Sequence, residues 1–148
     1  MKFSLCAPLL ALSVLCASSS AWAQPDAATA AAAKEKGAVV TSSGLVYLSL
    51  KEGSGPSPQA TQTVKVHYRG TFPDGKEFDS SYKRNEPTSF PLNRVIPCWT
   101  EGVQRMKVGG KSQLVCPADI AYGDRGSPPL ITGGATLIFE IELLGVTP

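Results

Sequence analysis

The sequence offers few residues for covalent or metal chemistry. Gly109–Ser112 (GGKS) resembles the end of a phosphate-binding loop, but Arg105 stands where that motif needs a glycine. The single histidine, His67, falls within an alternating strand pattern, where a structural or solvated side chain is expected. Cys98 and Cys116 lack the further Cys or His ligands of a zinc site. We therefore expect no hydrolytic or phosphoryl-transfer chemistry, no metal and no cofactor.

A set of aromatic residues among predicted turns, with one nearby carboxylate, Asp79, is the remaining candidate site. Each aromatic taken alone is better explained as part of a small hydrophobic core. The set is Tyr68, Phe78, Phe90, Trp99, Tyr122 and Phe139.

Residues 1–23 have the pattern of a secretory signal peptide. Lys2 is followed by an apolar stretch, and Ala21-Trp22-Ala23 is a typical cleavage site. A membrane anchor is less well supported because serines interrupt the apolar stretch before it could span a bilayer. Lipoprotein processing at Cys16 is also less well supported, because the bulky Leu15 precedes it. We expect a periplasmic or secreted protein without stable membrane insertion.

Cys98 and Cys116 remain after cleavage near Ala23. A pair of cysteines in an oxidising compartment favours a disulfide, while two buried thiols are the alternative. The formal net charge is only +2, and no long run of Lys or Arg occurs, so nucleic-acid binding is not expected.

The elements that position these residues are mostly strands. The Ala-rich segment 24–43 is interpreted as a linker that forms a short helix or a tether. The folded domain is expected over residues 44–148. Strand patterns occur at 45–50, 64–69, 111–116 and 135–146. One helical pattern begins near Pro97, repeats at Trp99, Val103 and Met106, and is ended by Gly109-Gly110. This order predicts an α+β domain in which an antiparallel sheet wraps one helix.

Several ordered segments then show a family resemblance. They are VHYRG at 66–70, GKEFDSS at 75–81, VIPCW at 95–99, AYG at 121–123 and ATLIFE at 135–140. In this order and spacing, over about residues 44–146, they resemble the FKBP-type peptidyl-prolyl cis-trans isomerases. The closest likeness is to small exported bacterial members of the macrophage infectivity potentiator type. The resemblance implies a five- or six-stranded antiparallel half-barrel around one short helix.

The resemblance also implies a pocket and a function. Trp99 would form the floor, Asp79 would pair with Arg84, and the Ile96 N–H and Tyr122 hydroxyl would bind peptide carbonyls. The walls would be Tyr68, Phe78, Val95, Ile96, Tyr122 and Phe139, with Phe90 and Ile131 at the edges. The expected substrates are proline-containing segments of unfolded or exported proteins. Macrolide inhibitors are further candidate ligands.

Some features depart from the family or leave alternatives open. Cys98 stands where the family usually has glycine, and Thr88 stands where several members carry an aromatic at the rim. A non-catalytic peptide-binding or chaperone module on the same fold is the alternative function. The short segment between signal and domain lacks the long dimerisation helix of larger members, so a monomer is expected.

Overall fold

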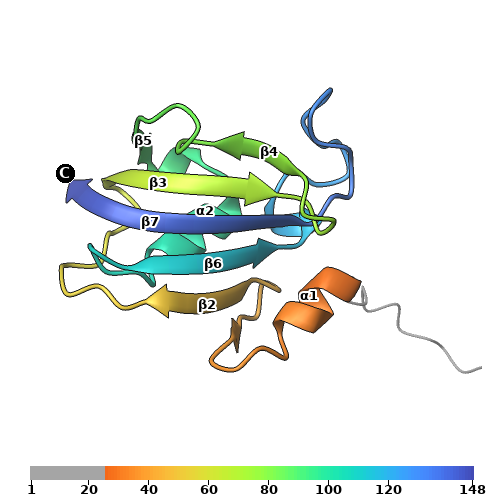
Figure 1. The fold of residues 1–148 in the computed structure, drawn as a ribbon, viewed down its shortest axis with the longest axis horizontal. Helices are drawn as coiled ribbons and strands as arrows, with labels where there is room; N and C mark the ends of the chain where they lie inside the picture. Colours follow the sequence, from red (N-terminus) through yellow and green to blue (C-terminus); the bar gives the residue numbers. More distant parts are fainter. Residues whose placement is uncertain (1–25) are drawn as a thin grey trace, which may run out of the picture.

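A computed structural model describes residues 26–148, so the predicted signal peptide lies outside the described residues. One seven-stranded antiparallel sheet has the order β1-β2-β6-β7-β3-β4, and β5 also pairs with β3 (Figure 1). The strands are β1 (Val39–Val40), β2 (Val46–Lys51), β3 (Thr63–Thr71), β4 (Glu77–Ser80), β5 (Thr88–Pro91), β6 (Lys111–Cys116) and β7 (Leu137–Thr147). The predicted α+β fold class is confirmed. The expected five or six strands become seven when the short β1 is included.

The two longest strands, β3 and β7, form the centre of the sheet. Tyr68 lies opposite Ile141, and Gly70 lies opposite Phe139. Along β3, Val64, Val66 and Tyr68 are buried while Lys65 and Arg69 are exposed. Because side chains alternate between the faces of a strand, the apolar set points to one side and the charged set to the other.

Helix α2 (Pro97–Val103) covers the apolar face of the sheet (Figure 1). Pro97 begins the helix at a position where its missing N–H costs nothing. A Cβ at Gly102 would overlap the Leu114 side chain, so glycine permits the close approach of helix and sheet. The helix ends at Val103, short of the end predicted at Gly109-Gly110. The Met106 N–H instead bonds the Val103 carbonyl at 3.0 Å, which turns the Met106 side chain into the core.

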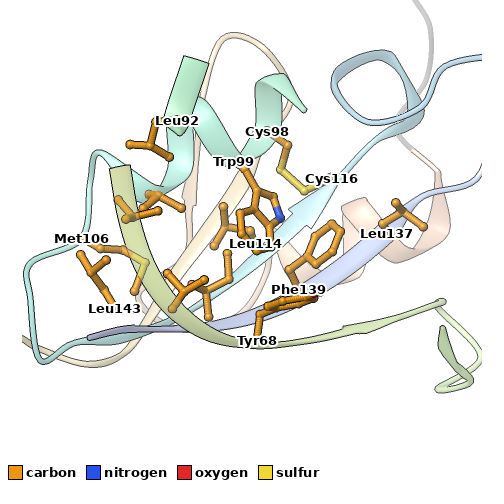
Figure 2. Packing of buried hydrophobic residues seen from close by; sticks show 14 of the residues in the cluster. Tyr68, Leu92, Cys98, Trp99, Met106, Leu114, Cys116, Leu137, Phe139 and Leu143 are labelled. Atoms are coloured by element: carbon orange, nitrogen blue, oxygen red, sulfur yellow. A yellow bond between two sulfur atoms is a disulfide. The ribbon is translucent and has the colours of Figure 1, made fainter. Parts of the chain in front are cut away.

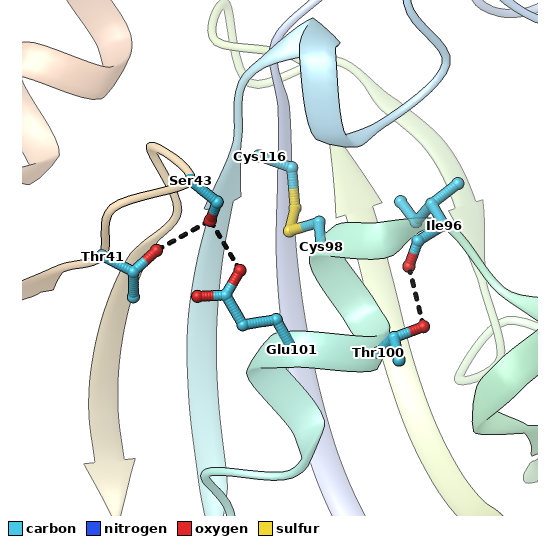
Figure 3. The surroundings of a disulfide bond; sticks show 7 residues. All are labelled: Thr41, Ser43, Ile96, Cys98, Thr100, Glu101 and Cys116. Carbon is cyan, nitrogen blue, oxygen red and sulfur yellow. Dashed lines mark hydrogen bonds between the residues drawn. A yellow bond between two sulfur atoms is a disulfide. The ribbon is translucent and has the colours of Figure 1, made fainter. Parts of the chain in front are cut away.

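The core fills the space between α2 and the sheet (Figure 2). Its large buried side chains include Leu45, Leu92, Met106, Leu114, Leu137, Ile141 and Leu143. A disulfide joins Cys98 on α2 to Cys116 at the end of β6, with the Cα atoms 5.8 Å apart (Figure 3). In the same region, the Ser43 hydroxyl donates to Glu101 at 2.5 Å, a second and exposed link to α2.

The described part of the predicted linker contacts the sheet. Helix α1 (Ala27–Ala32) begins at Asp26, which accepts a hydrogen bond from the Thr29 N–H at 2.8 Å. Ala32 packs on Val46 and Val115, on the face of the sheet opposite the main core. Within residues 26–148, no helix has the length and apolarity needed to cross a bilayer.

Candidate active site

A pocket of about 450 Å³ opens between the sheet, α2 and the preceding 3₁₀ turn η1 (Leu92–Arg94). Its lining residues are Tyr68, Phe78, Asp79, Phe90, Arg94, Val95, Ile96, Trp99, Tyr122 and Phe139. The structure therefore brings together most of the residues singled out in the sequence. Ile131 and Arg84 lie outside the lining, and Arg94 is a lining residue that sequence reasoning missed.

Trp99 lines the pocket although its side chain is almost fully buried, and Figure 2 shows it packed among the core side chains. Its ring meets Tyr68, Phe90 and Phe139 nearly edge-to-face, with centroid separations of 5.3, 5.4 and 5.3 Å. Its buried indole N–H has no oxygen or nitrogen partner within the described residues. The three ring contacts, with Tyr68, Phe90 and Phe139, hold the indole in place.

Phe78 and Asp79 are neighbours on β4, yet both line the pocket. Adjacent residues in a regular strand point to opposite faces. Here the pairing with β3 shifts register between Gly70 and Thr71, and such a bulge re-aims side chains. The Phe78 ring lies over Gly70, where an added Cβ would stand 2.5 Å from Phe78 Cζ. Gly70 thus gives Phe78 its space, and the sequence analysis did not single it out.

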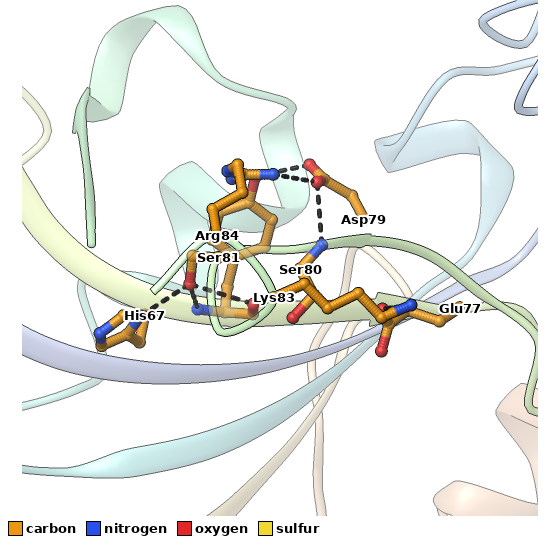
Figure 4. Close-up of polar contacts among 8 residues, drawn as sticks. His67, Glu77, Asp79, Ser80, Ser81, Lys83 and Arg84 are labelled. Atoms are coloured by element: carbon orange, nitrogen blue, oxygen red, sulfur yellow. Dashed lines mark hydrogen bonds and ion pairs between the residues drawn. The ribbon is translucent and has the colours of Figure 1, made fainter. Parts of the chain in front are cut away.

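Asp79 is the centre of a polar cluster at the pocket wall (Figure 4). The Tyr68 hydroxyl donates to Asp79 Oδ2 at 2.5 Å, and Arg84 Nη1 pairs with Oδ1 at 2.7 Å. Arg84 Nη2 also donates to the Tyr68 hydroxyl oxygen at 3.1 Å, and the Ser80 N–H donates to Oδ1. Arg84 therefore lies behind Asp79, with its guanidinium holding both wall residues.

The cluster sets the charge of these groups. Burial alone would raise the pKa of Asp79, but hydrogen bonds from Tyr68 and Arg84 outweigh it and lower the pKa. Burial, together with the hydrogen bond to Asp79, raises the pKa of Tyr68. At neutral pH the pocket wall thus holds an ionised carboxylate and a neutral phenol.

Ser81 holds the backbone of Tyr68, a role that sequence reasoning missed. The Tyr68 N–H donates to Ser81 Oγ at 2.8 Å, and the Ser81 N–H donates to the Tyr68 carbonyl at 3.0 Å. The hydroxyl also contacts His67 Nδ1 at 2.9 Å (Figure 4). His67 stacks on Tyr82 on the other face of the sheet, at 4.8 Å between ring centroids. It does not line the pocket.

Besides the Trp99 indole N–H, a backbone N–H and a hydroxyl at the pocket have no hydrogen-bond partner within residues 26–148. They are the backbone N–H of Ile96, which immediately precedes α2, and the Tyr122 hydroxyl. Tyr122 is 40% exposed at the pocket mouth. Both groups are therefore open to a ligand.

Ile131 lies in the core beneath the 123–134 loop. Its backbone exchanges two hydrogen bonds with Ser127, of 2.8 and 2.9 Å, which close the loop tip. Ile131 thus anchors the loop, and its expected role at the edge of the pocket stays a prediction. Among the described residues, no group of three or more His, Cys, Asp or Glu side chains is arranged to hold a metal ion.

Comparison with known proteins adds independent findings. Residues 55–144 match a family model described as FKBP-type peptidyl-prolyl cis-trans isomerase. The chain is 53% identical over 116 residues to "FKBP-type peptidyl-prolyl cis-trans isomerase FkpA" of Escherichia coli strain K12, covering 78% of this chain and 43% of that protein. The FkpA of Aeromonas hydrophila is 52% identical over 117 residues, covering 79% and 43%.

A solved structure agrees with these matches. The crystal structure of FkpA from Escherichia coli superposes with a TM-score of 0.79 at 51% identity, covering 81% of this chain and 56% of that one. The chain spans less than half the length of these two FkpA proteins. The family match over residues 55–144, the identity and the shared fold confirm the resemblance: this chain belongs to the FKBP-type peptidyl-prolyl cis-trans isomerase family.

Proposed function

We propose that this chain is a peptidyl-prolyl cis-trans isomerase that acts by non-covalent binding in the aromatic pocket. The observation that carries the proposal is the pocket itself, where a Trp99 floor meets an ordered Tyr68–Asp79–Arg84 wall. Family membership supports it. The reaction needs no nucleophile, because only rotation about a C–N bond occurs.

The geometry suits this rotation. A planar peptide bond resists twisting by about 18–20 kcal/mol, because resonance is lost. The twisted state is less dipolar than the planar amide, so an apolar site favours it relative to water. The rings of Phe78, Trp99 and Phe139 provide that surface for the proline. The Ile96 N–H and the Tyr122 hydroxyl would hold carbonyl groups on either side of the rotating bond.

Asp79 has a mainly orienting role in this proposal. Its carboxylate fixes the Tyr68 hydroxyl at 2.5 Å and is itself fixed by Arg84. The negative charge of the Asp79 carboxylate would also act on the carbonyl of the X-Pro bond as that bond rotates out of conjugation. Apolar burial and oriented hydrogen bonds together can supply about 8 kcal/mol, the lower end of enzymatic barrier reductions.

We further propose that the chain is exported and cleaved near Ala23, and that it acts on proline-containing segments of exported proteins. The Cys98–Cys116 disulfide supports this, because such bonds persist in oxidising compartments. Macrolides are candidate inhibitors, and we expect Thr88, which stands where several family members carry an aromatic at the rim, to alter their fit. The expected monomer is tested by sedimentation of the mature chain.

The direct test is NMR exchange spectroscopy on a short X-Pro peptide with the mature chain added. We expect faster cis-trans exchange with the parent and its loss in a Tyr68→Ala, Asp79→Ala double variant. A well-folded parent that binds the peptide without accelerating exchange would overturn the enzymatic proposal and favour a binding module.

A further inference from the structure

Arg94 is a positive charge at the pocket that the proposed mechanism does not use. It ends the 3₁₀ turn η1, two residues before Ile96, and lines the pocket while remaining exposed to solvent. Its guanidinium makes no ion pair or side-chain hydrogen bond among residues 26–148. All of its donors are thus available to a ligand.

The other charge at the pocket is already neutralised. Asp79 pairs with Arg84 at 2.7 Å and accepts a hydrogen bond from the Tyr68 hydroxyl, and the other lining residues besides Arg94 have aromatic or aliphatic side chains. Arg94 is therefore the uncompensated charge at the described pocket. A peptide bound there meets a positive potential on the side of η1.

We infer that Arg94 is a specificity-determining residue that favours X-Pro segments carrying a carboxylate next to the proline. The inference rests on the proposed function, because it assigns the substrate class of the same pocket. A guanidinium is planar and matches a carboxylate with paired N–H donors, so Asp or Glu is the side chain it selects. Arg94 is two residues from Ile96, so its side chain lies beside the part of the substrate backbone that the Ile96 N–H would bind.

The preference is modest because Arg94 is solvent-exposed. Ion pairs of exposed side chains change an equilibrium by up to about fivefold, and salt screens them. We expect a peptide with Glu beside the proline to exceed its Gln counterpart by about two- to fivefold in kcat/KM. This ratio should fall towards one as the ionic strength rises from about 0.01 M to about 1 M.

The test measures exchange catalysis and peptide affinity by NMR for matched Glu and Gln peptides. The charge is placed directly before the proline in one pair of peptides and directly after it in the other. The ratio of kcat/KM for the Glu peptide to kcat/KM for the Gln peptide is compared in the parent, in Arg94→Gln and in Arg94→Glu. We expect a ratio above one in the parent for at least one pair, near one in Arg94→Gln, and below one in Arg94→Glu.

Arg105→Gln is the matched control, because Arg105 follows α2, lines no part of the pocket and contacts Glu101 only at 3.9 Å. It should keep the parental ratio. A parental ratio of one, or a ratio that Arg94→Gln leaves unchanged, overturns the inference even if the Gln peptides are isomerised normally. If no peptide is isomerised, the proposed function fails separately, and the same Glu-to-Gln ratio in affinity still decides the role of Arg94.

Discussion

The two faces of the sheet use the same strands for different purposes. On β7, Phe139 lies against Trp99 in the pocket, while its neighbour Glu140 pairs with Lys111 on the outer face at 2.6 Å. On β3, Tyr68 binds Asp79, and the next residue, Arg69, pairs with Glu77 at 2.6 Å. Along each of these strands, one residue thus lines the pocket, and the next residue forms an ion pair on the outer face.

Strand β4 carries two carboxylates, Glu77 and Asp79, that differ in their location relative to the pocket. Lys83 and Arg69 lower the pKa of Glu77, just as Tyr68 and Arg84 lower that of Asp79 against the effect of burial. Both carboxylates are ion-paired, yet only Asp79 lines the pocket and orders an aromatic wall. A lowered pKa therefore does not distinguish the two carboxylates. The location of Asp79 at the aromatic pocket is what supports its proposed role.

The largest expected difference between the faces concerns aromatic side chains. Trp99→Ala should lower the free energy of unfolding by about 3–5 kcal/mol, because it removes a buried ring and leaves a cavity. Tyr82→Ala, on the outer face, should cost at most about 1.5 kcal/mol, the contribution of one aromatic pair. Urea unfolding measures the loss of unfolding free energy in each variant. If Trp99→Ala does not fold, Trp99→Phe is measured in its place. Equal losses for Trp99→Ala and Tyr82→Ala would contradict the contrast.

The two links to α2 provide the next comparison. The disulfide spans 18 residues, so a Cys98→Ala, Cys116→Ala double variant should lose about 3 kcal/mol of unfolding free energy. Ser43→Ala removes the exposed hydrogen bonds of this hydroxyl to Glu101 and Thr41 and should cost less than about 1.5 kcal/mol. Denaturant titration measures both losses. Thiol titration of the unreduced, denatured mature chain should find no free thiol, and two free thiols would refute the disulfide.

Two glycines test how tightly the pocket side is packed. Gly70→Ala forces a Cβ against the Phe78 ring and should cost about 1–3 kcal/mol while weakening peptide binding. Gly145→Ala, at the far end of β7, meets its nearest atom only at 4.0 Å and should be tolerated. Unfolding and peptide titrations of both variants give the comparison. A tolerated Gly70→Ala would show that Phe78 has more freedom than its contacts indicate.

The smallest expected effect is the contribution of Asp79 to the pH dependence of the unfolding free energy. Because the pKa of Asp79 is lower in the folded state, its stabilisation is complete above the unfolded value of about 3.9 and is lost as pH falls through the folded value. The pair is partly exposed, so the contribution is about 0.2–1 kcal/mol. Urea midpoints between about pH 5 and about pH 2 should fall less in Asp79→Asn than in the parent. Identical slopes would mean that folding does not favour the ionised Asp79.

The central strands and the pocket residues could be predicted from the sequence. The alternation along β3 and β7 reports burial directly, because a half-buried strand must alternate. The ordered motifs then placed Tyr68, Asp79, Trp99 and Phe139 at one site through family resemblance.

Other features depend on register and turns that no local pattern encodes. The bulge that turns both Phe78 and Asp79 into the pocket requires the pairing of β3 with β4. Arg94 reaches the pocket through a single 3₁₀ turn, and the serine that holds Tyr68, Ser81, resembles any polar residue after a strand. The Ala-rich segment has no apolar periodicity, yet Ala32 is buried because small side chains suffice for close packing of α1.

The most direct test of the account compares Asp79→Ala with Glu77→Ala in peptide exchange spectroscopy at equal protein concentration, with folding checked by circular dichroism. Hydrogen bonds to charged groups contribute about 1.5–3 kcal/mol, so Asp79→Ala should slow catalysed exchange by about tenfold or more. Glu77→Ala removes a carboxylate from the same strand and should stay within about twofold of the parent. Equal losses in the two variants, or full activity of Asp79→Ala, would contradict the claim that the pocket face carries the function.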